Sequence, residues 1–124
     1  MKKSILIVDD NPDVRFSVKL GLEDLDASYE VITAESGDKC LEFLKNNQIP
    51  DIILLDIMMP REDGWNIFAK VKEKLEWRNI PIIFLTAKTD DYSKGFGSIS
   101  ADDYVEKPFD IEDLKKRIDN ILNR

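Results

Sequence analysis

Three aspartates, a threonine and a lysine each follow a short apolar run, and together these residue types could bind a cation and accept a phosphoryl group. They are Asp9, Asp10, Asp56, Thr86 and Lys107. Three ionised carboxylates held close together repel one another, and a hard divalent cation relieves that repulsion. Mg²⁺ prefers oxygen ligands and takes one or two carboxylates together with phosphate oxygens and water. We therefore expect Asp10 and Asp56 to be direct ligands and Asp9 to be a ligand held through water.

The same residues suit the transfer of a phosphoryl group onto a carboxylate. Asp56 is the expected nucleophile, and it needs no base because a carboxylate has no proton to lose. Lys107 can pair with Asp56 and later with a phosphate oxygen, while Thr86 offers a hydroxyl donor. The cation and Lys107 would offset the charge that develops as Asp56 attacks in line.

The apolar pattern predicts five strands that alternate with helices. Continuous β-branched and aliphatic runs are typical of strands that are buried on both faces. The predicted strands cover residues 4–9, 29–34, 51–56, 80–85 and 103–106. The predicted helices begin near residues 11, 36, 64, 89 and 110. The helix at 89–97 is weakly predicted because it contains two glycines.

Apolar residues at helical spacing indicate which side of these helices packs against a sheet. The third helix is expected to run through Ile67, Val71 and Leu75, which are spaced by four. Asp110 is expected to cap the last helix, because aspartate accepts from the free N–H groups of a first turn.

The alternation of strands and helices predicts an α/β fold. We expect a doubly wound, flavodoxin-like sheet of five parallel strands in the order 2-1-3-4-5, with helices on both faces. Strands one and three are neighbours in that order, and ligands of such sheets bind at the carboxyl ends of the strands. Asp9, Asp10 and Asp56 should therefore converge, flanked by Thr86 and Lys107.

The composition excludes several classes of function. The 124 residues include no histidine, which removes Ser-His-Asp catalysis, histidine metal ligands and a phosphohistidine on this chain. The single cysteine, Cys40, cannot form an intramolecular disulfide and is expected in the core. A net charge of −7 argues against binding nucleic acid or an anionic membrane through bulk charge. No apolar run has the length of a signal peptide or a membrane span, so we expect a cytoplasmic protein.

Five stretches, taken in order, resemble the receiver domain of two-component response regulators over nearly the whole chain. Each is weak alone, and the set is specific. The matching stretches are residues 5–10 (ILIVDD), residues 51–60 (DIILLDIMMP), Gly64, Thr86-Ala87 and residues 101–109 (ADDYVEKPF).

The resemblance implies a role for each matching residue of the predicted site. Asp56 matches the phosphoacceptor, and Asp9 and Asp10 match the acidic pocket that binds Mg²⁺, for which Mn²⁺ is a substitute. The backbone carbonyl of Met58 matches a further ligand of the metal. Lys107 matches the family's lysine beside the phosphoryl group.

Two further residues match the family's conformational switch. Thr86 matches the hydroxyl that moves toward the phosphoryl group, and Tyr104 matches the aromatic side chain that swings inward on activation. The family often has a cis peptide before the proline that matches Pro108.

The function that the resemblance implies is a phosphorylation-activated switch rather than an enzyme. A histidine kinase or a histidine phosphotransfer protein would donate the phosphoryl group, and slow autodephosphorylation would follow. The surface of helix four, strand five and helix five would then change its contacts with a downstream protein, with a homodimer as one outcome. We expect residues 1–124 to form a single receiver domain without an output domain, either as a stand-alone protein or as part of a longer regulator or hybrid kinase.

Two alternatives from other functional classes stay open at this point. One is a constitutive interaction module that keeps the receiver fold and never cycles phosphate; the intact acidic set argues against it. The other is a phosphohydrolase of the haloacid dehalogenase type, although neither Asp9 nor Asp56 stands in the Asp-x-Asp pattern of that group. A single aspartate at a strand end is more often a turn former or a cap, so only the three together point to a site.

Overall fold

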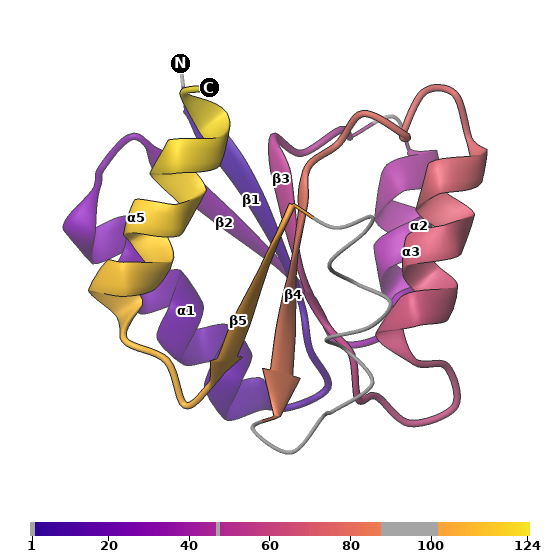
Figure 1. The fold of residues 1–124 in the computed structure, drawn as a ribbon, viewed down its shortest axis with the longest axis horizontal. Helices are drawn as coiled ribbons and strands as arrows, with labels where there is room; N and C mark the ends of the chain where they lie inside the picture. The colour runs from indigo at the N-terminus through magenta and orange to yellow at the C-terminus, as the bar shows by residue number, and fades with distance from the viewer. Residues whose placement is uncertain (1, 47, 88–101) are drawn as a thin grey trace.

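The computed structural model describes residues 2–46, 48–87 and 102–124, which form a five-stranded parallel sheet between two layers of helices (Figure 1). The strand order is β2-β1-β3-β4-β5. The strands are β1 (Lys3–Val8), β2 (Tyr29–Ala34), β3 (Ile52–Asp56), β4 (Ile82–Ala87) and β5 (Asp103–Lys107). The predicted fold class and strand order are confirmed.

The helices divide between the two faces of the sheet. The helices α1 (Pro12–Leu25) and α5 (Ile111–Leu122) cover one face, and α2 (Gly37–Lys45) and α3 (Gly64–Glu73) cover the other. Each central strand contributes alternate side chains to two separate hydrophobic cores, one under each pair of helices. This explains the continuous apolar runs in the sequence, because both faces of these strands are buried.

Polar residues at the helix starts hold the chain where each strand passes into a helix. Asn11 caps α1, with Pro12 in its first turn, and Ser36, Asp63 and Asp110 cap α2, α3 and α5. Each cap side chain accepts a hydrogen bond from an N–H of the first turn, which would otherwise lack a partner. The predicted cap at Asp110 is confirmed.

The expected extension of the third helix to Leu75 is wrong. The helix α3 ends at Glu73, and Leu75 is 74% exposed. In the turn after the helix, Trp77 and Ile80 are buried in the core under α2 and α3, whereas Leu75 points to solvent. The helix predicted at 89–97 lies outside the described residues.

The thiol of Cys40 lies inside the core under α2, and burial raises its pKa to about 12. Because the thiolate is the reactive form, we expect the folded protein to react with an aromatic disulfide reagent at least about 100-fold more slowly than the chain in denaturant. Absorbance of the released thiol would measure both rates. Equal rates would contradict a buried position for Cys40.

The edge strand β2 is closed at its midpoint by two side chains of α1. Glu23 accepts a hydrogen bond from the N–H of Val31 at 2.8 Å, and Lys19 donates one to the Val31 carbonyl at 2.7 Å. Lys19 and Glu23 also pair with each other at 3.0 Å. We call these two side chains on Val31 the Lys19–Glu23 clamp. The hydrogen bond from Val31 and the nearby lysine lower the pKa of Glu23, so the clamp carries opposite charges at neutral pH.

None of the described helices is both long enough and apolar enough to cross a membrane.

Candidate functional site

The carboxyl ends of the strands bring the three predicted aspartates together. Asp9 follows β1 and Asp56 ends the neighbouring β3. Carboxylate oxygens of Asp9, Asp10 and Asp56 lie within 4.8 Å of one another. The donor set therefore fits a hard divalent cation, because oxygen ligands at this separation can share one ion.

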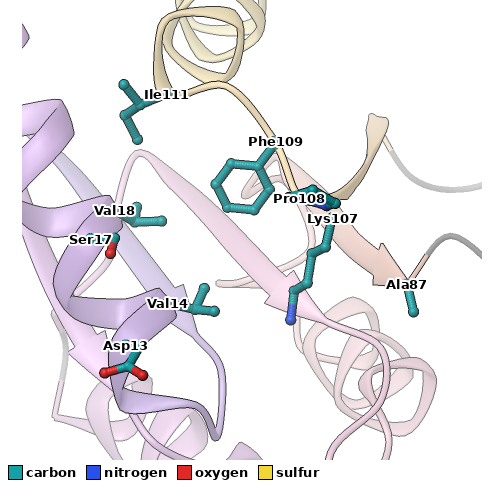
Figure 2. A pocket seen from close by; sticks show the side chains of 9 residues that line it. All are labelled: Asp13, Val14, Ser17, Val18, Ala87, Lys107, Pro108, Phe109 and Ile111. Carbon is teal, nitrogen blue, oxygen red and sulfur yellow. The ribbon is translucent and has the colours of Figure 1, made fainter.

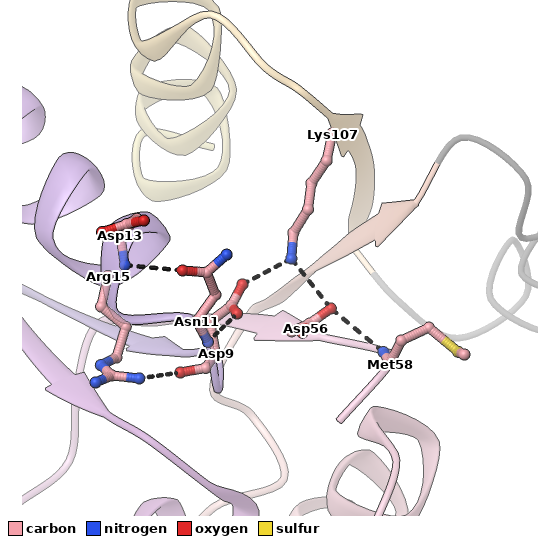
Figure 3. Close-up of polar contacts among 7 residues, drawn as sticks. All are labelled: Asp9, Asn11, Asp13, Arg15, Asp56, Met58 and Lys107. Carbon is pink, nitrogen blue, oxygen red and sulfur yellow. Dashed lines mark hydrogen bonds and ion pairs between the residues drawn. The ribbon is translucent and has the colours of Figure 1, made fainter. Parts of the chain in front are cut away.

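Asp9 is fully buried, and both of its carboxylate oxygens accept hydrogen bonds (Figure 3). The N–H of Asn11 donates to Oδ1 at 2.9 Å, and Nζ of Lys107 donates to Oδ2 at 2.8 Å. A carboxylate whose two oxygens are both engaged is poorly placed for direct contact with a metal. This arrangement is consistent with the expectation that Asp9 holds a cation through water.

Lys107 reaches from the end of β5 to a point between two of the aspartates. Its Nζ lies 2.8 Å from Oδ2 of Asp9 and 3.4 Å from Oδ1 of Asp56. The sequence argument paired Lys107 with Asp56 alone, whereas the shorter contact is with Asp9. Burial lowers the pKa of Lys107, but the hydrogen bond to Asp9 and the charges of both aspartates outweigh it and leave the pKa above its ordinary value.

Asp56 is 3% exposed. The negative charge of the neighbouring Asp9 carboxylate acts on it more strongly than the positive charge of Lys107 does. Burial and the charge of Asp9 raise the pKa of Asp56 to about 7, against the opposing effects of Lys107 and the Met58 N–H. Removing water from a carboxylate and placing a second carboxylate beside it both disfavour the charged form. A cation bound at Asp56 would therefore stabilise the ionised carboxylate of that residue.

Met58 contacts Asp56 through its backbone N–H, whereas the resemblance assigned its backbone carbonyl to the metal. That N–H lies 3.3 Å from Oδ1 of Asp56. The Met58 side chain is exposed and the residue follows β3 in the connection to α3. Its predicted role as a carbonyl ligand of a metal stays a prediction.

Gly64 lies directly behind the Asp56 peptide, which sequence reasoning did not anticipate. A Cβ at this position would stand 2.5 Å from the Asp56 carbonyl oxygen and 2.9 Å from Cα of Ile57. The N–H of Gly64 also donates to the Ile57 carbonyl at 2.8 Å. The start of α3 therefore packs against the backbone of Asp56, at a distance that leaves no room for a side chain.

Thr86 and Tyr104 lie on the neighbouring strands β4 and β5. Thr86 is buried, and its hydroxyl donates to the Ala87 carbonyl at 2.9 Å. Tyr104 is half-buried, with its ring stacked on Phe84 at 5.6 Å between centroids. Its hydroxyl is buried and has no hydrogen-bond partner within residues 2–46, 48–87 and 102–124, and burial raises its pKa. The Lys107–Pro108 peptide bond is cis, as the resemblance implied.

A pocket of about 470 Å³ opens next to Lys107, between α1 and the connection from β5 to α5 (Figure 2). Its walls are mainly apolar, with polar groups from three residues at its rim. The lining residues are Asp13, Val14, Ser17, Val18, Ala87, Lys107, Pro108, Phe109 and Ile111. This mainly apolar pocket therefore lies next to the charged site.

Arg15 is the residue at this site that sequence reasoning missed. Its guanidinium donates to the Asp9 carbonyl at 2.7 Å (Figure 3). The apolar spacing of α1 marks Arg15 only as a polar position, and a contact with a backbone oxygen leaves no trace in residue types. In the sequence, only its position six residues after Asp9 indicated that Arg15 lies near the site.

Comparison with known proteins points to one family. The family model described as the response regulator receiver domain matches residues 5–119. Response regulator Rre1 of Synechocystis is 35% identical over 123 residues, which cover 98% of this chain and 52% of that protein. The alkaline phosphatase synthesis transcriptional regulatory protein PhoP of Bacillus subtilis is 36% identical, over 100% of this chain and 50% of PhoP. The chain spans about half the length of these curated relatives.

A solved structure agrees with the family match. The CheY-like response regulator receiver domain protein from Methanospirillum hungatei is 35% identical and superposes with a TM-score of 0.84. The similarity covers 99% of this chain and 96% of that one.

Proposed function

Because this chain belongs to the response regulator receiver domain family of two-component signalling, we propose that it is a switch that accepts a phosphoryl group on Asp56. The observation that carries the proposal is the buried Asp56 carboxylate, held at a strand end beside Asp9 and Lys107. A carboxylate held there can act as a nucleophile toward phosphorus, and a bound cation would offset its negative charge.

The donor in this proposal is a phosphohistidine on a histidine kinase or a histidine phosphotransfer protein. The oxygen–phosphorus bond to Asp56 forms as the phosphorus–nitrogen bond of the donor breaks, and the electron pair of the broken bond leaves with the imidazole. Lys107 and the Met58 N–H both contact Oδ1 of Asp56 and so hold the carboxylate in place for this step.

Asp10 and Asp56 would hold Mg²⁺ directly, with the Met58 carbonyl as a further ligand and Asp9 acting through water. When bound, Mg²⁺ supplies positive charge that neutralises the phosphoryl oxygens. Lys107 would contribute a second positive charge from its place between Asp9 and Asp56. A positioned cation of this kind stabilises developing negative charge without having to reorganise.

The phosphoryl group would change the balance of contacts around the site. By analogy with other phosphorylated side chains it adds about −1.5 to −2 charge and three acceptor oxygens. Lys107 and the Thr86 hydroxyl would turn toward those oxygens, and Tyr104 would follow Thr86 inward. These shifts bias an equilibrium between two states that exist before phosphorylation.

We propose that the readout surface consists of the segment between β4 and β5 together with β5 and α5. A downstream protein would distinguish the two states there, with a homodimer as an alternative consequence. Residues 1–124 would act as one receiver domain in the cytoplasm, together with its phosphohistidine donor.

The test is the intact mass of the protein after incubation with acetyl phosphate. We expect one added phosphoryl group with Mg²⁺ present and none with excess chelator. If no adduct forms, beryllofluoride with Mg²⁺ should still change the fluorescence of Trp65, which follows Gly64 and packs against Phe84 with 4.5 Å between ring centroids. No adduct together with no fluorescence change would overturn the proposal in favour of the constitutive interaction module.

A further inference from the structure

We propose that Arg15 is a positioning residue for the cation site, because it fixes the peptide that joins Asp9 to Asp10. This inference rests on the proposed function, since it assumes that Asp10 contacts a divalent cation.

Nη1 of Arg15 donates to the Asp9 carbonyl oxygen at 2.7 Å, and the Arg15 side chain is half-buried. Arg15 lies in the first turn of α1, where its own N–H donates to the Asn11 carbonyl at 3.2 Å. A charged donor at this distance makes one of the stronger hydrogen bonds found in proteins.

The other hydrogen bonds of this loop hold side chains and the start of α1. The Asp9 side chain is fixed by the Asn11 N–H and by Lys107, and the Asn11 side chain accepts from the Asp13 N–H at 2.8 Å. These contacts hold the Asp9 side chain and the start of α1, and the turn closed by the Asn11 N–H constrains the Asp9–Asp10 peptide only through that side chain. Among the described residues, Arg15 is the side chain that donates to that peptide itself, at its carbonyl oxygen (Figure 3).

The Asp10 carboxylate is exposed, and within the described part of the chain it has no hydrogen-bond or ion-pair partner. The direction in which this side chain leaves the backbone therefore depends on the orientation of the preceding peptide. By holding the oxygen of that peptide, Arg15 sets where the Asp10 carboxylate lies relative to Asp56.

The sign of a mutational effect separates positioning from simple electrostatics. Arg15 is a cation close to a cation site, so by Coulomb's law alone its removal should strengthen binding of a divalent ion. If Arg15 acts by holding the Asp9–Asp10 peptide, its removal should weaken binding instead. Loss of a hydrogen bond that orients a metal ligand typically costs between about tenfold and 100-fold in affinity.

The experiment measures Mn²⁺ affinity from the electron paramagnetic resonance signal of the free ion, without any phosphodonor. We expect Arg15→Met to bind Mn²⁺ about tenfold more weakly than the wild type. Arg15→Lys should recover part of the loss, because lysine keeps one donor and the charge but is shorter. Urea unfolding of each variant establishes that the titrated protein is folded.

The matched control is Lys19→Met, one helical turn further along α1. Lys19 also donates to a backbone carbonyl, that of Val31, at 2.7 Å. The control removes the same charge and a hydrogen bond of the same length, so its Mn²⁺ affinity should equal that of the wild type. A loss confined to Arg15→Met would assign the effect to the Asp9 peptide.

Unchanged or stronger Mn²⁺ binding by folded Arg15→Met would overturn the inference. If Arg15→Met does not fold, an affinity of Arg15→Lys equal to that of the wild type would overturn it. Asp10→Asn separates this failure from that of the proposed function. A wild type whose Mn²⁺ affinity does not depend on Asp10 would refute the cation site as well, whereas a dependence on Asp10 without one on Arg15 would refute only the role of Arg15.

Discussion

Replacing Asp56 with asparagine is expected to abolish phosphoryl uptake from acetyl phosphate, as measured by intact mass. The amide has almost the same shape as the carboxylate but lacks the anionic oxygen that would attack phosphorus. Asp51→Asn is the matched control, because Asp51 directly precedes the same strand at its opposite end and accepts from the Ser4 N–H at 2.7 Å. It should take up one phosphoryl group, as the wild type does. Uptake by Asp56→Asn at the wild-type rate would place the acceptor elsewhere.

The same variant should be more stable than the wild type in chelator, which excludes unfolding as the cause of lost uptake. Burial and Asp9 raise the pKa of Asp56 to about 7 in the folded state, against 3.8 in the unfolded chain. Ionised Asp56 therefore costs stability, and this cost grows as the pH rises from about 4 to 7. At pH 8 we expect the free energy of unfolding in urea to be higher for Asp56→Asn than for the wild type, by on the order of 2 kcal/mol. This difference should shrink toward pH 5.

Gly64→Ala is expected to have the second large effect, on stability and on the acceptor together. The added Cβ would stand 2.5 Å from the Asp56 carbonyl oxygen, and a backbone atom cannot rotate away as a side chain can. Either α3 or the Asp56 peptide must move, and we expect a loss of about 3 kcal/mol in the free energy of unfolding in urea. Phosphoryl uptake should slow in the fraction that stays folded, because the carboxylate moves with its backbone.

Gly21→Ala provides the comparison for that loss. Its Cβ would meet the Ile111 side chain at 2.6 Å, which is a similar overlap with a group that can change its rotamer. Alanine also stabilises the middle of a helix by about 1 kcal/mol relative to glycine. The net change should therefore stay within about 1 kcal/mol of the wild type. Equal losses in the two variants would show that the Asp56 backbone is not a rigid neighbour of Gly64.

Much of the fold could be predicted because its strands are buried on both faces. Such strands need continuous apolar runs, and the polar residue that ends each run marks the sheet edge where ligands bind. Knowing the order 2-1-3-4-5 is then enough to bring Asp9 next to Asp56. The end of α3 was not predictable in this way, because Leu75 continues the apolar spacing of the helix although the helix ends at Glu73 and Trp77, in the turn that follows, is the buried residue.

The finer geometry of the site depends on contacts that residue types do not encode. The sequence places Lys107 near two aspartates, but its shorter contact, with Asp9, depends on side-chain reach across two strands. The contact of Arg15 with the Asp9 carbonyl involves a backbone atom that every residue possesses. The packing of Gly64 against Asp56 depends on the path of the loop between them, which no periodic pattern describes.

The Lys19–Glu23 clamp on Val31 determines how this sheet can meet other chains. An exposed edge strand is a template for a further strand, from a partner or from an aggregating copy. At Val31 both backbone groups are already bonded to the charged ends of α1 side chains, so an incoming strand would have to displace an ion pair before it could form its own ladder. The β2 side of the sheet is thereby protected against strand addition, and association at this edge would have to rely on side-chain surfaces.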